Sequence, residues 1–197
     1  MNKNSIIEQL RQLAAARGVS LDDEVLEKVV EMSQFRVYPK GAAVKCMGDR
    51  ADEFGIVIEG LVRGYYIDGD GNDMTRGFAS EGGFFMDEGL TGYEEHLCMW
   101  ETIEESTVML IDAAAFKRLV MSSEALKTIW IGLLEAALRY KIYRESSFLT
   151  SNAAERYAYL RKNFPQILDR VPLKHIATYL GIAPESLSRI RRAMKDE

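Results

Sequence analysis

Apolar positions near the start of the chain recur at helical spacing and predict two short amphipathic helices. The first covers positions 6–14 and the second positions 21–30. A capping arrangement of Ser20 with Glu24 is expected to begin the second helix. The apolar positions are Ile6, Ile7, Leu10, Leu13 and Ala14 in the first helix, and Leu21, Val25, Leu26, Val29 and Val30 in the second.

Between Phe35 and about Asp112 the helical spacing gives way to short apolar runs separated by turn-forming residues. The longest turn cluster runs from Asp68 to Asn72 and contains two glycines. Many short strands at regular spacing favour a double-stranded β-helix, or jelly roll, rather than a parallel sheet. The clearest predicted strands are Phe54 to Ile58, Leu61 to Ile67 and Thr107 to Ile111.

From Ala113 the spacing is helical again, and residues 123–148 are predicted to form one long helix. Its apolar residues advance by four, three, four and three positions, which gives a single seam. This seam either pairs with the same helix of a second copy or packs on the roll of its own chain. We expect a homodimer. The seam consists of Leu126, Trp130, Leu133, Ala137 and Tyr140.

The chain is thus predicted to have an α+β fold in three parts. Residues 1–122 form a sensor-like β-roll with N-terminal helices, and residues 123–151 form a dimerisation helix and hinge. Residues 152–197 form a helix-turn-helix domain, which begins with a helix that Phe164-Pro165 ends.

The helix-turn-helix prediction depends on the segment from Leu173 to Arg192. Gly181 separates two helical patterns and suits a turn with positive φ, while Ala177 is small where two crossing backbones approach. Ala183-Pro184-Glu185 is suited to begin the second helix. The apolar residues expected on the inner faces are Ile176, Leu180, Ile182, Leu187 and Ile190.

The outer surface of the second helix carries the side chains that suit a major groove. Arg189 can form a bidentate pair with a guanine edge, and Glu185 can accept from a cytosine amino group. Ser186 and Ser188 complete the expected base-reading set. The residues expected to contact phosphates, and so to give affinity without sequence information, are Lys174, His175, Arg191, Arg192 and Lys195.

Charge is unevenly distributed along the 197 residues, whose net charge is −5. Residues 152–197 hold 9 basic and 5 acidic side chains, whereas residues 1–151 hold 16 and 25. A basic module behind an acidic body favours DNA binding at one end. No apolar run is long enough for a membrane span, and no secretion signal precedes Arg17, so we expect a cytoplasmic protein without a membrane partner.

Several of these segments resemble the Crp/Fnr family of bacterial regulators. The stretch from Val171 to Ile190 resembles the DNA-reading motif of that family, and its base-contacting glutamate and arginine fall on Glu185 and Arg189. A first arginine used by several members falls on Pro184, so that contact is absent. The β-roll resemblance is carried by Phe35-Arg-Val-Tyr-Pro-Lys-Gly, Gly48-Asp, Ile58-Glu-Gly and Asp70-Gly-Asn.

The resemblance implies a homodimeric transcription regulator that reads a near-palindromic site in double-stranded promoter DNA and acts with RNA polymerase. It implies a helix-turn-helix of winged-helix type. Because the chain stops at Glu197, soon after the second helix of the motif, we expect the two-stranded wing to be truncated.

The predicted nucleotide pocket departs from the family pattern. Met86-Asp87 replaces the Gly-Glu pair that holds the ribose, and His96-Leu97 replaces the pair whose arginine holds the cyclic phosphate. A phosphate needs a permanent cation or backbone donors opened by glycine. We therefore expect no cyclic AMP or cyclic GMP binding, and the small-molecule effector is unknown. The degenerate pocket is expected at Met86, Asp87, Glu88, Gly89, Leu90, His96 and Leu97.

Other functions fit the sequence less well. Cys46 and Cys98 are too few for an iron–sulfur cluster, and together with His96 they lack the pattern of a haem site, so no cofactor is expected. A metal-dependent roll enzyme would need several converging histidines, and the chain has two. No enzymatic activity is expected. The remaining alternative is a regulatory module that senses a small molecule and acts on a protein partner.

Overall fold

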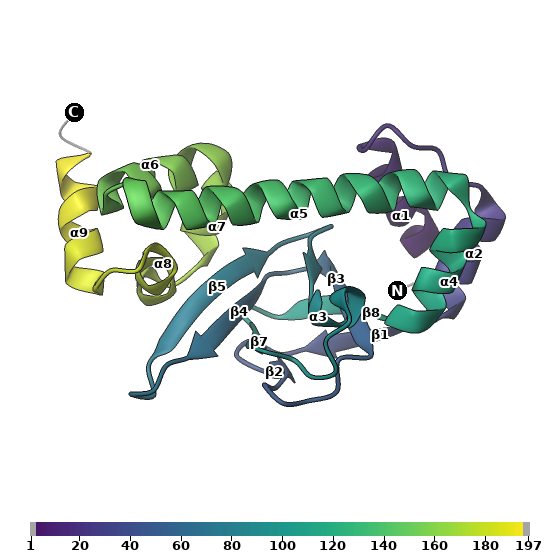
Figure 1. Ribbon diagram of the computed structural model, residues 1–197, viewed down its shortest axis with the longest axis horizontal. Coiled ribbons are helices and arrows are strands. Elements are labelled where there is room, and N and C mark those ends of the chain that lie inside the picture. The colour runs from purple at the N-terminus through teal and green to yellow at the C-terminus, as the bar shows by residue number, and fades with distance from the viewer. Residues whose placement is uncertain (1–2, 195–197) are drawn as a thin grey trace.

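The computed structural model describes residues 3–194 as a β-roll, one long helix and a group of C-terminal helices (Figure 1). The N-terminal helices and the roll contain α1 (Lys3–Ala15), α2 (Asp23–Glu31), β1 (Ser33–Tyr38), β2 (Ala43–Lys45), β3 (Glu53–Glu59), β4 (Val62–Ile67), β5 (Asp73–Ala79), β6 (Phe84–Phe85), α3 (Glu88–Thr91), β7 (Met99–Thr102) and β8 (Ser106–Asp112). The helices that follow are α4 (Ala113–Ser122), α5 (Glu124–Thr150), α6 (Ala153–Asn163), α7 (Pro165–Arg170), α8 (Leu173–Leu180) and α9 (Pro184–Ala193).

The roll consists of two four-stranded antiparallel sheets, ordered β1-β8-β3-β6 and β2-β7-β4-β5. Strand β8 is buried on both faces, because its alternating side chains enter two different cores. Val108 and Leu110 belong to the core between the sheets, whereas Met109 and Ile111 belong to the core shared with the helices. These observations confirm the predicted fold class and the three strands expected from the sequence.

The two N-terminal helices are confirmed, but the expected start of the second is wrong. Asp22 is the N-cap of α2, and no side chain caps the helix. Leu21 is buried in the core that α1, α2 and α4 share with the first sheet. Because Asp22 has extended backbone and α2 begins at Asp23, Ser20 lies two residues before the N-cap and is not the capping residue.

Helix α5 confirms the prediction of one long helix. The Ser123 hydroxyl caps it by accepting a hydrogen bond from the Leu126 amide at 3.3 Å. The helix runs from the N-terminal helices across the roll to the C-terminal helices (Figure 1). Among residues 3–194, no helix is long and apolar enough to cross a membrane.

The C-terminal helices share a core with the roll. Asn152 and Glu155 form a capping box that begins α6, and Pro165 begins α7. Leu61 and Ile103 come from the roll but belong to the same buried cluster as residues of α6, α7, α8 and α9. The C-terminal helices are therefore docked on the sheet.

Candidate DNA-reading surface and sensor pocket

Helices α8 and α9 form the helix-turn-helix predicted from the sequence. Only three residues connect them, and the first, Gly181, has a φ of +69°. A Cβ at this position would also lie 2.7 Å from the Phe148 ring. Both the positive φ and this close approach therefore favour glycine. Ala177 and Leu187 are completely buried, as expected for inner-face residues that fix the crossing of the two helices.

Helix α9 lies at the far end of the molecule from α1 (Figure 1), with its polar face uncovered. The Arg189 guanidinium donates to the Ser186 hydroxyl at 3.1 Å. That bond can be exchanged for one to a ligand. The Ser188 hydroxyl instead donates to the Pro184 carbonyl of its own helix at 3.0 Å. The exposed predicted DNA contacts on α9 are Glu185, Ser188, Arg189, Arg191 and Arg192, while Ser186 is half-buried.

Helix α8 is less accessible than expected. Lys174 is exposed, but His175 is buried, with 7% of its surface accessible, so its assignment as a phosphate contact is wrong in this arrangement. The reason is that α8 packs along β5, where the hydroxyls of Thr75 and Thr178 lie 2.6 Å apart. This long-range contact leaves no trace in the helical spacing. Lys195, also expected at phosphates, lies outside the described residues.

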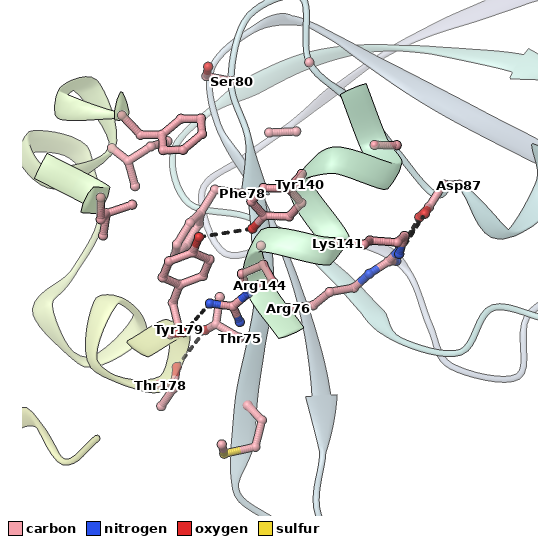
Figure 2. Close-up of a pocket in the computed structure, with 18 of the residues that line it drawn as sticks. Thr75, Arg76, Phe78, Ser80, Asp87, Tyr140, Lys141, Arg144, Thr178 and Tyr179 are labelled. Carbon is pink, nitrogen blue, oxygen red and sulfur yellow. Dashed lines mark hydrogen bonds and ion pairs between the residues drawn. The ribbon is translucent and has the colours of Figure 1, made fainter. Parts of the chain in front are cut away.

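Tyr179 joins the C-terminal helices to both the roll and α5. Its ring lies 5.6 Å from that of Phe78 on β5, and its hydroxyl lies 3.1 Å from the Tyr140 hydroxyl. Arg144 donates to the Tyr179 carbonyl at 2.8 Å (Figure 2). Tyr179 thus contacts α5 and β5 at once.

An ion-pair network strengthens the same docking. Arg170, at the end of α7, bridges Glu81 at 2.8 Å and Glu104 at 2.5 Å, two carboxylates that belong to loops of the roll. Hydrogen bonds to both carboxylates raise the pKa of Arg170, and the hydrogen bond from Arg170 lowers the pKa of Glu81. The network holds one cation between two anions across the domain contact.

In the degenerate pocket, charged side chains pair with one another. Arg76 of β5 pairs with Asp87 at 2.6 Å and with the buried Glu88 at 3.0 Å. His96 is also buried, and its Nδ1 lies 3.4 Å from the other Glu88 oxygen. Glu88, Gly89 and Leu90 form most of α3, whereas Leu97 is exposed. Sequence reasoning missed Arg76, because its partners lie 11 and 12 residues away on another element.

Two features show that this cluster is closely constrained. Met86 has a φ of +61°, a left-handed conformation that non-glycine side chains rarely adopt. The Cys98 thiol lies 3.6 Å from Glu88, and burial raises its pKa to about 12. It is therefore a neutral thiol at physiological pH.

The cluster makes stability depend on pH. Burial opposes ionisation of Glu88, but the hydrogen bond with His96 and the charge of Arg76 outweigh it and lower its pKa to about 2. The ionised Glu88 therefore stabilises the folded state. This stabilisation is complete above about pH 4.5 and is lost as the pH falls towards 2. Between pH 6 and pH 2.5 the parent should lose about 2–3 kcal/mol more free energy of unfolding than Glu88→Gln. Urea denaturation of both proteins between pH 6 and pH 2.5 measures this difference in the free energy of unfolding.

The exposed Glu94→Gln provides the matched control and should keep the parent's pH dependence. If the free energy of unfolding changed equally with pH in Glu88→Gln and in the parent protein, the assigned role of Glu88 would be contradicted.

The predicted seam of α5 faces the chain's own core. Leu126 is buried, and Trp130 packs against the same cluster, with its ring 6.1 Å from Phe116. Leu133 also faces that core, and Tyr140 reaches Tyr179. Leu126, Trp130, Leu133 and Tyr140 therefore pack within their own chain, which is the second interpretation of the seam, whereas Ala137 is exposed. A dimer contact through these residues stays a prediction.

A different stripe of α5 is uncovered. Five large apolar side chains are exposed at spacings of three, four, four and seven residues, which places them on one face of the helix, opposite the packed seam. Leu138 is 60% exposed and Leu149 79% exposed. We call this face the outer stripe; it consists of Ile131, Leu134, Leu138, Ile142 and Leu149.

The arrangement defines a class of protein: a β-roll joined by one long helix to a helix-turn-helix. Residues 35–123 match the family model described as cyclic nucleotide-binding domain. This part of the chain is therefore similar to cyclic nucleotide-binding domains, and the chain shares the α+β architecture of the solved regulators described next.

Solved structures share this fold over most of the chain. FixK2 from Bradyrhizobium japonicum is 20% identical, with a TM-score of 0.71 over 83% of this chain and 85% of that chain. CLP of Xanthomonas campestris, described as a c-di-GMP responsive global regulator, is 19% identical, with a TM-score of 0.69 over 89% and 92%. The catabolite activator protein of Thermus thermophilus is 20% identical, with a TM-score of 0.57 over 89% and 84%. A comparison with curated protein sequences found no match.

Proposed function

We propose that this protein is a homodimeric transcription regulator that reads promoter DNA with α9. The observation that carries the proposal is the free polar face of α9. It presents Glu185 and Arg189 on one exposed surface, while Leu187 locks the helix to α8 from behind. An exposed helix of this kind fits the major groove, where arginine pairs with guanine and glutamate accepts from cytosine.

The outer stripe of α5 is the proposed dimer contact. A contiguous apolar face on a long helix is costly in water, and pairing with the same face of a second copy removes it from solvent. Because α5 leads directly into α6, such a dimer carries two copies of α9. We propose that they enter successive major grooves about 34 Å apart on a near-palindromic site. Regulation then depends on where the site lies relative to RNA polymerase, the expected protein partner.

We further propose that the nucleotide pocket does not take cyclic AMP or cyclic GMP. The guanidinium of Arg76, which lies beside the pocket residues, is already paired with Asp87 and Glu88. A cyclic phosphate would have to displace two carboxylates that lie close to its own binding place. This like-charge arrangement opposes an anionic ligand.

The first test is selection of bound sequences from a random duplex pool by the purified protein without added effector. The proposal expects enrichment of a two-fold symmetric site. Enrichment of no motif would overturn effector-independent DNA reading. The alternative function, a regulatory module that acts on a protein partner, would then be favoured.

Two arginine variants separate base reading from phosphate contact. Arg189→Ala should lose about 1–3 kcal/mol of specific binding and relax discrimination at one base pair of each half-site. Arg192→Ala should weaken binding to all sequences and lower the salt dependence by about one counterion per subunit. Both side chains are exposed on α9, so the pair is matched in fold and location. Titration of operator and mismatched duplexes at several salt concentrations measures both effects.

If Arg189→Ala discriminated between operators as well as the parent protein, the assignment of the base-reading residue would be overturned.

A further inference from the structure

Helices α6, α8 and α9 gather at the C-terminal end of α5 (Figure 1) and share one buried cluster. Only Ser151 and Asn152 lie between α5 and α6, so these helices follow α5 through a very short connection. The angle at that connection determines where α9 lies relative to α5. A contact that fixes the angle therefore also fixes the direction of the proposed reading helix.

Arg156, in α6, makes such a contact. Its Nε and Nη2 donate to the Leu180 carbonyl at 3.2 and 3.0 Å. Its Nη1 donates to the Ser151 carbonyl at 2.5 Å and to the Ser147 carbonyl at 3.4 Å. One planar guanidinium thus uses three nitrogens to join the last turn of α5, the connection after it and the end of α8.

The carbonyls that accept these bonds explain why a cation suits this position. Leu180 is the last residue of α8, and Ser151 is the C-cap of α5. Carbonyls at the C-terminal end of a helix lack partners within the helix and carry the negative end of its dipole. Arg156 therefore lies at two such ends at once, where a neutral side chain would supply fewer donors and no opposite charge.

The Phe148 ring strengthens the same connection. The guanidinium groups of Arg144 and Arg156 lie 4.7 and 4.8 Å from its centre, within the range of an attractive cation–π contact. The ring also approaches Gly181 so closely that a Cβ there would lie 2.7 Å from it. Because Phe148 belongs to α5 and Gly181 to the turn between α8 and α9, this turn is held against α5 as well.

We propose that Arg156 is a positioning residue that fixes the angle between α5 and the helix-turn-helix, and thereby the half-site spacing that the dimer recognises. The inference rests on the proposed DNA reading by a dimer. In that dimer the two α5 helices are paired, so the angle within each chain sets the separation of the two copies of α9. Arg156 acts without touching DNA, since it is half-buried and donates within its own chain.

The test uses duplexes in which the half-sites of the selected operator are moved two base pairs closer or farther apart. Each change shifts one half-site by about 7 Å along the DNA axis. The parent protein should prefer its best spacing by ~10-fold or more, because only that spacing lets one dimer hold both half-sites. Arg156→Gln should reduce this preference to about 3-fold or less. It should bind an isolated half-site like the parent, since the surface of α9 is unchanged.

Two further variants serve as controls, with circular dichroism showing which proteins are folded. Arg161→Gln makes the same change at an exposed position of α6 and should keep the parent's spacing preference. Arg156→Lys keeps the charge but donates from one nitrogen instead of three, so its preference should lie between those of the parent and Arg156→Gln. Should Arg156→Gln fail to fold, Arg156→Lys decides the question.

A purely structural role for Arg156 gives a different result. Arg156→Gln would then lose affinity for the isolated half-site and for every spacing in equal proportion, with its spacing preference intact. That result would overturn the proposal.

Pulsed electron paramagnetic resonance measures the angle without DNA. Nitroxide labels are attached at Ala136→Cys on α5 and Ser188→Cys on α9, in a Cys46→Ser background, since Cys98 is buried. An excess of unlabelled chain ensures that each dimer carries one labelled copy. The distribution of label distances should be narrow in the parent and in Arg161→Gln and broader in Arg156→Gln. Equal widths in the parent and in Arg156→Gln would overturn the positioning role.

This second measurement separates the inference from the function on which it rests. If the parent protein bound no two-fold symmetric DNA, the proposed function and the spacing rule would both be overturned. The label distances would still decide whether Arg156 fixes the angle between α5 and α9.

Discussion

Leu138→Glu is expected to convert the proposed dimer to a monomer and to weaken binding to a palindromic operator by about 100-fold or more. The substitution places one carboxylate from each copy at the middle of the outer stripe. Two like charges at an apolar contact oppose each other and cannot be hydrated there. The loss is large because each half-site must then be bound on its own. Sedimentation velocity and operator titration measure the two effects.

Ala136→Glu is the matched control for this prediction. It introduces the same charge on the same helix two residues away, which is about 160° around the helix axis. It should remain dimeric and bind the operator like the parent protein. A dimeric Leu138→Glu would place the self-association surface elsewhere.

Leu187→Ala is expected to destabilise the C-terminal helices by about 2–5 kcal/mol. Leu187 is completely buried between α8 and α9, in the core that also includes Ala177 and Leu180. Removing its side chain leaves a cavity where the two helices cross, so the orientation of α9 loses its support as well. Thermal denaturation should show a lower midpoint, and specific DNA binding should fall even where the roll stays folded.

The control for this substitution is Leu97→Ala. It makes the same chemical change at an exposed leucine of the roll and should alter the free energy of unfolding by less than about 0.5 kcal/mol. If both variants melted alike, the Leu187 side chain would not be the link that holds α9 to α8.

Local pattern was sufficient for much of this fold. Spacing alone located α1, α5, three strands of the roll and the helix-turn-helix, because each depends on neighbouring residues. Gly181 and Ala177 could be assigned their roles since a short turn between crossing helices restricts both positions sterically. The exposed polar face of α9 followed from the same argument.

What the sequence did not reveal depends on contacts between distant segments. Helix α5 carries leucines and isoleucines around most of its circumference, so the pattern could not decide whether Leu133 or Leu134 faces the roll. His175 is buried because α8 packs on β5, about 100 residues away in the chain. Arg76 was missed for the same reason, since a strand arginine gives no sign that it pairs with carboxylates on α3 and its N-cap.

The 27 residues of α5 form a helix about 40 Å long, which packs on the roll, exposes the outer stripe and contacts α8. One side rests on the roll, the opposite side is the outer stripe, and the far end holds Tyr179 through Arg144 and Tyr140. A rigid rod cannot turn one side without turning the other. In the proposed dimer, a small rotation of α5 on the roll would therefore move both copies of α9 symmetrically. The spacing of the half-sites that such a dimer prefers would then report how α5 is held on the roll.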